Sequence, residues 1–201
     1  MPDAKPRFMS SAPDALSVGP VRCTWGPHRH GTPAESLARP WLAAALGVPA
    51  AALGLARDAH GRPRLAAPGF DASWSHSGER LLVALGAGVQ LGADLELLRP
   101  RPRALALAER FFTPAEAAAL AALPAPAREP AFVRLWCAKE AVLKAHGRGL
   151  AFGLDRLEFA RDGEGWRLAA SDPALGAPAD WTLHAFAPMP GYLATLAWRA
   201  V

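Results

Sequence analysis

One long helix that ends at a glycine constrains this chain more than any other feature. The pattern of residues 129–146 predicts a single helix that stops at Gly147. Within it, Glu140 and Lys144 stand four residues apart and therefore share one face. Only three of the 22 basic residues are lysines, and two of them, Lys139 and Lys144, lie in this helix. Because lysine carries a compact ammonium group, we expect these two positions to need a point charge.

Strand-like runs and further helices surround that helix. Short apolar runs lie within residues 21–97 and again within 154–198, and Ala34–Leu46 has helical spacing. Thr113, Pro114 and Glu116 predict the start of another helix, with a capping threonine and a capping-box glutamate. The order helix, strands, helices, strands predicts an α+β fold.

Two prolines, at positions 100 and 102, divide the chain into comparable parts. We expect a flexible N-terminal arm over 1–18, an N-terminal α+β half over 19–98 and a C-terminal α+β half over 103–201. Within the first half, Leu81–Leu85 and Val89–Leu97 are separated by glycines, which predicts adjacent antiparallel strands.

The composition limits the cellular compartments and the classes of partner that we expect. The chain has 201 residues, 51% of them hydrophobic, which suffices for a core without disulfides. Its two cysteines do not form a disulfide framework, and it contains neither a signal-peptide-like run nor a membrane-length apolar stretch. We therefore expect a cytoplasmic protein without membrane contact. The net charge of +4 favours an acidic, phosphate-bearing or nucleic-acid partner and does not distinguish among them.

Three carboxylates are candidates for a metal site. Asp94 and Glu96 stand two residues apart, so on a strand they would share a face at roughly 6.5–7 Å along the chain. Carboxylates of this kind bind Mg²⁺ together with waters and substrate phosphates. Alternatively, they form a solvated acidic face. Glu140 would join them only if its helix packs beside that strand; otherwise Glu140 and Lys144 are a surface pair worth about 0.3–0.5 kcal/mol.

Two further residues could meet an anion. His76 lies between Ser75 and Ser77, where it could donate to a phosphate or simply belong to a capped turn. Arg62 follows a glycine in a tight turn and is either anion-binding or solvated. Cys137 lacks a histidine–acid arrangement, so we interpret it as a packing residue.

Together these motifs resemble the 4′-phosphopantetheinyl transferase superfamily. Six elements occur in the family's order between about residues 60 and 155: Gly61–Pro63, Ser75–Ser77, Gly92–Glu96, Phe112–Glu116, Trp136–Lys144 and Gly147–Leu150. Gly92–Glu96 corresponds to the family's Gly-x-Asp-x-Glu motif, and Phe112–Glu116 to its Phe-(Ser/Thr)-x-x-Glu segment. Trp136–Lys144 corresponds to its Trp-x-x-Lys-Glu-(Ala/Ser)-x-x-Lys motif. The chain departs from the family at Arg62, where lysine is usual, and at Ala93, where valine or isoleucine is usual.

The length of the chain resembles the long, Sfp-like type of this family. That resemblance implies a monomeric pseudodimer of two similar α+β halves, each a small antiparallel sheet with a long packed helix. The active site would lie between the halves.

The resemblance also implies a reaction and its residues. The family transfers 4′-phosphopantetheine from coenzyme A to a serine of an apo acyl or peptidyl carrier protein of fatty acid, polyketide or nonribosomal peptide biosynthesis, and releases 3′,5′-ADP. By resemblance, Mg²⁺, with Mn²⁺ as an alternative, would be bound by Asp94, Glu96 and Glu140. Catalysis would use Glu140 and Lys144, and coenzyme A would contact Arg62, Ser75, His76, Lys139 and Lys144.

Two other functions remain open from the residues alone. The same carboxylates would serve a Mg²⁺-dependent phosphohydrolase or nucleotidyl transferase, although the chain lacks a Walker-type loop. The positive charge would also suit a non-catalytic module that binds nucleic acid or a protein partner. Against that module, the arginines are scattered and form no compact basic stripe.

Overall fold

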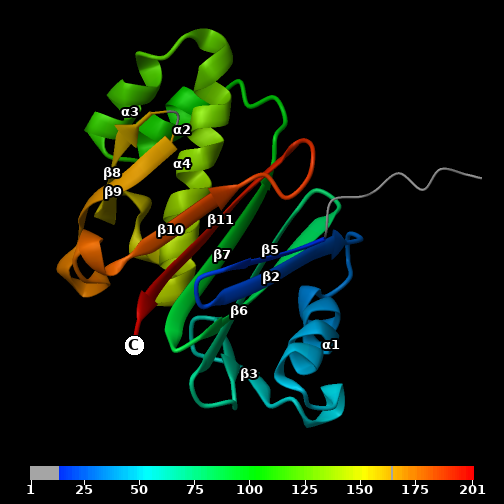
Figure 1. Cartoon of the computed structure of the whole chain (residues 1–201). Coiled ribbons are helices and arrows are strands. Elements are labelled where there is room, and N and C mark those ends of the chain that lie inside the picture. The colour runs from blue at the N-terminus through cyan, green and yellow to red at the C-terminus, as the bar shows by residue number, and fades with distance from the viewer. Residues whose placement is uncertain (1–13, 164) are drawn as a thin grey trace, which may run out of the picture.

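The computed structural model describes residues 14–163 and 165–201 and stacks two antiparallel sheets between two helices (Figure 1). The first sheet has the order β1-β2-β6-β5 and the second β10-β11-β7. The strands of the first sheet are β1 (Ala15–Val18), β2 (Val21–Pro27), β5 (Phe70–Ser77) and β6 (Arg80–Ala87). Those of the second are β7 (Val89–Leu97), β10 (Thr182–Phe186) and β11 (Tyr192–Ala200).

Helices and two small hairpins complete the fold. The helices are α1 (Ala34–Leu46), α2 (Ala104–Phe111), α3 (Pro114–Ala121) and α4 (Ala125–His146). One hairpin pairs β3 (Leu55–Arg57) with β4 (Pro63–Leu65), and the other pairs β8 (Leu157–Asp162) with β9 (Gly165–Ser171). Short 3₁₀ turns occupy Ala50–Ala52, Gly149–Phe152, Leu154–Arg156, Pro173–Leu175 and Pro178–Asp180. The predicted α+β class is confirmed.

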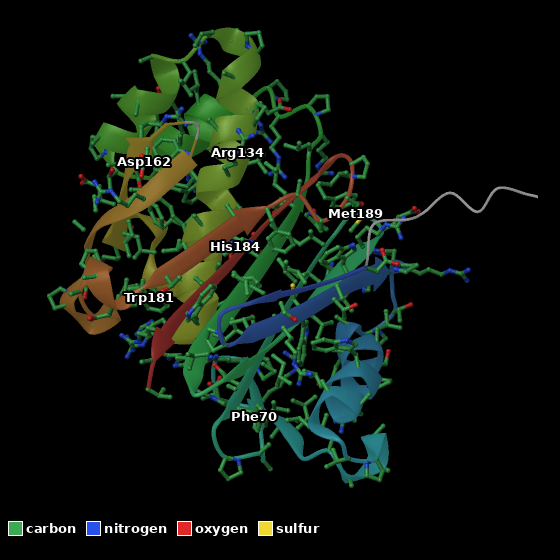
Figure 2. The ribbon with its side chains drawn as sticks, viewed as in Figure 1. Phe70, Arg134, Asp162, Trp181, His184 and Met189 are labelled. Atoms are coloured by element: carbon green, nitrogen blue, oxygen red, sulfur yellow. The ribbon has the colours of Figure 1, made fainter. Side chains whose placement is uncertain are left out.

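Side chains fill the spaces between these layers (Figure 2), and the buried apolar ones form three clusters. α1 packs on the outer face of the first sheet, where Leu42 joins Val83. The inner faces of both sheets meet in a second cluster that includes Leu82 and Leu91. α4 covers the outer face of the second sheet and shares a third cluster with α2, α3, β8 and β9. Each sheet is therefore buried on both faces, which fits the near-continuous apolar runs of β6 and β7.

The second sheet crosses the expected boundary between the halves. β7 pairs with β11, with Asp94 opposite Thr195 and Glu96 opposite Leu193. The prediction that β7 is an antiparallel neighbour of β6 is therefore wrong. Gly88, at φ +67, lets the chain turn so that β7 enters the other sheet, where its odd-numbered residues fill the inter-sheet core.

Other expectations are met or corrected at single elements. α1 has the predicted bounds, and Thr113 and Glu116 form the predicted capping box of α3. α4 ends as predicted at Gly147, in a left-handed conformation at φ +97, and begins at Ala125, earlier than expected. Residues 15–18 are not a loose arm, because they form β1 and pack Leu16 and Val18 against the inter-sheet core; residues 1–13 of that expectation lie outside the described residues. No helix in the described part of the chain is long and apolar enough to cross a bilayer.

Candidate active site

The two sheets meet at a seam where β5 runs beside β7 and side chains replace a backbone ladder. The run from Asp71 to Ser77 alternates, so every second residue of β5 points toward β7. Asp71 Oδ2, Ser73 Oγ and Ser77 Oγ accept hydrogen bonds from the backbone N–H groups of Leu91, Ala93 and Leu97 at 2.7, 2.9 and 3.1 Å. The constant offset of 20 residues means that the two strands are parallel.

α4 crosses β7 in direct backbone contact at Gly92. A Cβ atom at this position would lie 1.9 Å from the carbonyl oxygen of Ala141 and 2.5 Å from the backbone nitrogen of Ala145. Only glycine allows this approach. The contact brings the face of α4 that carries Glu140 and Lys144 next to Asp94.

Asp94 is the centre of the polar cluster at this crossing. Its Oδ1 accepts hydrogen bonds from Lys144 Nζ at 2.6 Å and from Ser75 Oγ at 2.8 Å, and Lys144 Nζ also donates to Ser75 Oγ at 2.8 Å. The side chain of Asp94 is 4% exposed. Its second oxygen, Oδ2, is buried and has no hydrogen-bond partner among the described residues. A buried carboxylate oxygen without a donor is uncommon, and a bound ion or water would satisfy it.

Charge accumulates around Glu140. Burial raises the pKa of Glu140, and the neighbouring charges of Asp94 and Glu96 raise it further to about 7, while Lys144 opposes them. Burial lowers the pKa of Lys144, but the charges of Asp94 and Glu140 outweigh burial and raise it overall. The three acids are thus near enough to repel one another, with one lysine among them.

Glu96 lies at the edge of this cluster and has other partners. Its Oε2 accepts hydrogen bonds from Arg101 Nη2 at 2.6 Å and Ser77 Oγ at 3.1 Å. Among residues 14–163 and 165–201, no group of three or more histidine, cysteine, aspartate or glutamate side chains is arranged to hold a metal ion. The expected three-acid site is therefore not preassembled among the described residues.

A divalent cation nevertheless fits the residues that are present. The unpartnered Asp94 Oδ2 is a hard oxygen ligand, and Glu140 needs a positive neighbour to ionise fully at neutral pH. A cation between them would satisfy both needs. Asp94 and Glu140 would hold it, with Glu96 as a third ligand.

A basic cavity adjoins the cluster on the side of Lys144. Besides Lys144 it is lined by residues of the β3–β4 hairpin, of β5 and of the segment after α4: Arg57, His60, Gly61, Arg62, Pro63, Ser73, Trp74, Gly147 and Gly149. The cavity brings three positively charged side chains, Arg57, Arg62 and Lys144, to one concave surface, which suits an anionic ligand.

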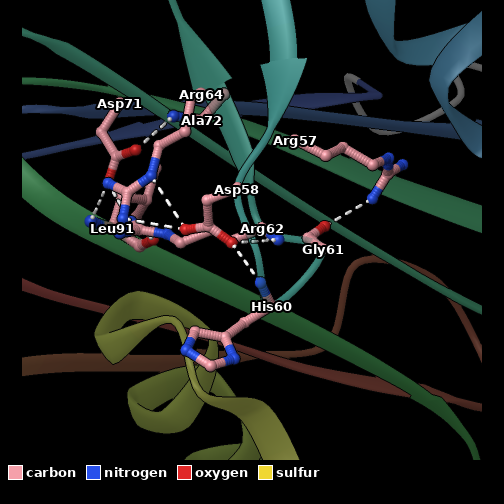
Figure 3. Close-up of polar contacts among 9 residues, drawn as sticks. All are labelled: Arg57, Asp58, His60, Gly61, Arg62, Arg64, Asp71, Ala72 and Leu91. Carbon is pink, nitrogen blue, oxygen red and sulfur yellow. Dashed lines mark hydrogen bonds and ion pairs between the residues drawn. The ribbon is translucent and has the colours of Figure 1, made fainter.

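Arg62 is buried and lines this cavity, and Figure 3 shows its polar contacts. Its Nη2 donates to Asp71 Oδ2 and, at 3.1 Å, to the carbonyl oxygen of Leu91, so it ties the β3–β4 hairpin to the seam. Burial lowers the pKa of Arg62, and Asp71 opposes that effect. Arg62 Nε and Nη1 have no partner in the described chain. Both nitrogens are themselves buried, so a ligand could reach them only after the Arg62 side chain shifts.

His76 lies on the other face of β5. Its exposed ring stacks on His28 with ring centroids 4.5 Å apart and planes inclined by 18°. Burial lowers the pKa of His76, with contributions from the nearby His28, Lys144 and His30. The ring is thus close enough to Lys144 to respond to its charge, and it is accessible to a ligand.

Comparisons with known proteins agree with this arrangement. A model of the 4′-phosphopantetheinyl transferase superfamily matches residues 90–197, more than half of the chain. This stretch includes α4 and all but the first residue of β7, the two elements that carry the acidic cluster. The chain belongs to this superfamily.

Individual relatives carry the same name. The 4′-phosphopantetheinyl transferase HetI of Nostoc sp. is 35% identical over 175 residues, which cover 84% of this chain and 70% of HetI. A similarly named protein of Synechocystis sp. is 39% identical over 100 residues, 48% of this chain and 41% of that protein. The transferase psf-1 of Bacillus pumilus is 39% identical over 87 residues, 43% of this chain and 36% of psf-1. The chain thus matches less than half of two of these three relatives.

Lys139 was predicted as a site residue, but its partners in the structure lie within the fold. Its ammonium is fully buried and donates to Glu116 Oε2 at 2.8 Å, to the Leu154 carbonyl at 2.8 Å and to the Leu157 carbonyl at 2.5 Å. It also lies 5.0 Å from the ring centre of Phe112. Lys139 therefore joins α4 to α3 and β8, and its contact with coenzyme A stays a prediction.

Sequence reasoning missed two parts of this site. The seam residues Asp71, Ser73 and Ser77 could have been found from the alternation of polar residues along β5, which indicates a polar strand face. Arg101, which holds Glu96, stands in an Arg-Pro-Arg-Pro-Arg run where nothing distinguishes it from its neighbours.

Proposed function

We propose that this protein transfers 4′-phosphopantetheine from coenzyme A to a serine hydroxyl of an apo acyl or peptidyl carrier protein, in a Mg²⁺-dependent reaction that releases 3′,5′-ADP. One observation carries the proposal. In a chain of this superfamily, Asp94, Glu140 and Lys144 come together from separate elements beside a basic cavity at the seam.

The cavity suits the phosphates of coenzyme A. Arg62 contributes a buried positive charge to the cavity wall, and Lys144 bridges the cavity and the acidic cluster. Ser75, which contacts both Lys144 and Asp94, orients the ammonium. His76 is accessible and near Lys144, so it would donate to a phosphate from the far side of β5.

Asp94 and Glu140 would hold the cation. Glu96 would be a third ligand once its carboxylate separates from Arg101. When bound, Mg²⁺ would orient the pyrophosphate and neutralise charge on the leaving phosphate. Phosphoryl transfer depends mainly on positioning and charge stabilisation, so this short list of residues suffices for catalysis.

Glu140 would take the proton in the transfer step. The serine oxygen of the carrier attacks the phosphorus that bears pantetheine, and the bond from that phosphorus to the bridging oxygen breaks. The electron pair stays on the bridging oxygen, which leaves with 3′,5′-ADP, and the serine proton passes to the Glu140 carboxylate. A carboxylate positioned beside the reacting hydroxyl can act as this base.

The wider setting belongs to the same proposal. Each sheet has one long helix on its outer face, α1 on the first and α4 on the second, which supports the pseudodimeric reading. With the site at the seam of one chain, the protein would work as a monomer in the cytoplasm, without nucleic acid or membrane.

A product analysis tests this function. Purified protein is incubated with coenzyme A, Mg²⁺ and a panel of apo carrier proteins from fatty acid, polyketide and nonribosomal peptide pathways. We expect 3′,5′-ADP to appear in equal amount to modified carrier, and a chelator to stop both. Release of inorganic phosphate from nucleotides, with no carrier modified, would instead indicate a phosphohydrolase.

A further inference from the structure

Arg101 makes the closest contact to Glu96. It lies in the connector between β7 and α2, and its Nη2 is 2.6 Å from Glu96 Oε2 and 3.5 Å from the Leu97 carbonyl oxygen. The two side chains are 17% and 20% exposed, so the pair is largely shielded from solvent. Arg101 and any other cation would therefore compete for the Glu96 carboxylate.

The position of Arg101 is itself fixed from α4. Its backbone N–H donates to Glu129 Oε2 at 2.6 Å, and Glu129 lies in the same helix that carries Glu140. The connector is therefore tied to α4, which keeps the guanidinium within reach of Glu96.

The hold of Arg101 on Glu96 is nevertheless incomplete. Arg101 Nε is buried and has no hydrogen-bond partner among residues 14–163 and 165–201. A buried donor without a partner has a free-energy cost, so the guanidinium is less firmly held than a fully bonded arginine. Such a side chain can be displaced by a stronger cation.

From these contacts we infer that Arg101 is a positioning residue that acts as the counter-ion of Glu96 in the cation-free protein and releases it when a divalent cation binds. The inference rests on the proposed cation site at Asp94 and Glu140. It accounts for the absence of a preassembled three-acid group in the described chain, because the third acid is paired with Arg101. Cation affinity is then set by competition with Arg101.

Metal titration of the whole 201-residue chain, freed of metal, tests the inference without substrate. Arg101→Gln removes the competitor, so we expect the variant to bind Mg²⁺ about five- to ten-fold more tightly than the unaltered protein. Isothermal titration calorimetry measures this difference, and Mn²⁺ should show a change in the same direction. Arg99→Gln is the matched control, because Arg99 is exposed and makes no side-chain hydrogen bond or ion pair with the described residues. It should change the affinity by less than about two-fold.

A double-mutant cycle separates competition for Glu96 from a general loss of positive charge. In a Glu96→Gln background, Arg101→Gln should increase the Mg²⁺ affinity no more than Arg99→Gln does. An equal gain with and without Glu96 would overturn the inference, and so would an unchanged or weaker affinity in Arg101→Gln alone. Arg101→Lys preserves the charge in case the glutamine variant folds poorly, and it should give a smaller gain in the same direction.

The outcome is independent of the transfer reaction. If no carrier is modified by the unaltered protein but the affinity differences appear, the proposed function fails and the role of Arg101 stands. If carriers are modified but the cycle shows no coupling between Arg101 and Glu96, the role of Arg101 fails alone.

Discussion

Gly92 and Ala141 meet backbone to backbone where α4 crosses β7. A Cβ atom on Gly92 would lie 1.9 Å from the Ala141 carbonyl oxygen, and neither backbone can yield as a flexible side chain would. This contact sets the distance between the helix that carries Glu140 and Lys144 and the strand that carries Asp94. The first residue of the Gly-x-Asp-x-Glu motif therefore serves the geometry of the site and not its chemistry.

Replacing Gly92 with alanine should separate α4 from β7. We expect Gly92→Ala to lower the free energy of unfolding by about 3 kcal/mol, as for overpacked cores. Carrier modification should fall by about a hundred-fold in the protein that remains folded, because the helix shift moves Glu140 and Lys144 from Asp94. Denaturant unfolding and the rate of carrier modification check both effects.

Gly26→Ala is the control, since a Cβ atom on Gly26 of β2 would meet nothing within 4 Å. It should leave both quantities nearly unchanged. Equal behaviour of the two variants would contradict the role assigned to Gly92.

Glu140 should make stability depend on pH in the absence of divalent cations. Its pKa is about 7 in the folded protein, against an ordinary value of 4.5, so the folded state binds the proton more tightly than the unfolded state. The stability linked to the protonated carboxyl is therefore present below pH 4.5 and is lost as pH rises to about 7. The loss amounts to about 3 kcal/mol.

Glu140→Gln removes this titration. The variant should gain stability relative to the unaltered protein as pH rises from 5 to 8, by up to about 3 kcal/mol. Urea unfolding at several pH values measures the difference. Parallel stability curves for the two proteins would rule out the raised pKa.

The buried pair of Lys139 and Glu116 should support the fold and not ligand binding. Lys139→Met leaves Glu116 charged and fully buried, and we expect a loss of about 3–5 kcal/mol. Adding Glu116→Gln should restore part of that stability, because the unpaired charge is removed. The KM for coenzyme A of the folded double variant should stay within about two-fold of the original. A large rise in KM without loss of stability would instead indicate contact with coenzyme A.

Asp94 should couple cation binding to stability. At a Mg²⁺ concentration about 100-fold above the Kd, the unaltered protein should gain about 2.7 kcal/mol, seen as a higher Tm. Asp94→Asn keeps oxygen and size but loses charge, so Mg²⁺ should raise its Tm little. A similar rise in both proteins would place the cation away from Asp94.

Local signals in the sequence were sufficient where the chain interacts with its near neighbours. The capping box of Thr113 and Glu116 and the stop of α4 at Gly147 depend on a few adjacent residues, and both were predicted. The pairing of β7 was not, because its partner β11 lies about a hundred residues away and the nearby β6 looked equally suitable. The inter-sheet core decides between them, and no local pattern reveals it.

The candidate site followed the same division. Glu140 and Lys144 share a helix face by their spacing, and the structure places both near Asp94. Lys139 and Lys144 are five residues apart, so their side chains point about 140° apart around the helix axis. The two lysines therefore face different surroundings. The motif resemblance assigned both lysines to one site, whereas the helix geometry places them on different faces. The pairing of Arg101 with Glu96 depends on the path of the connector, which the sequence does not disclose.

The most direct test of the account is the intact mass of an apo carrier protein after incubation with coenzyme A and Mg²⁺, compared between the unaltered chain and Asp94→Asn. We expect the unaltered chain to add the mass of one phosphopantetheine to the carrier serine. Asp94→Asn, folded to the same extent, should add it at least a hundred-fold more slowly. Equal rates in the two proteins, or no added mass with any apo carrier, would contradict the assignment of this seam as the transferase site.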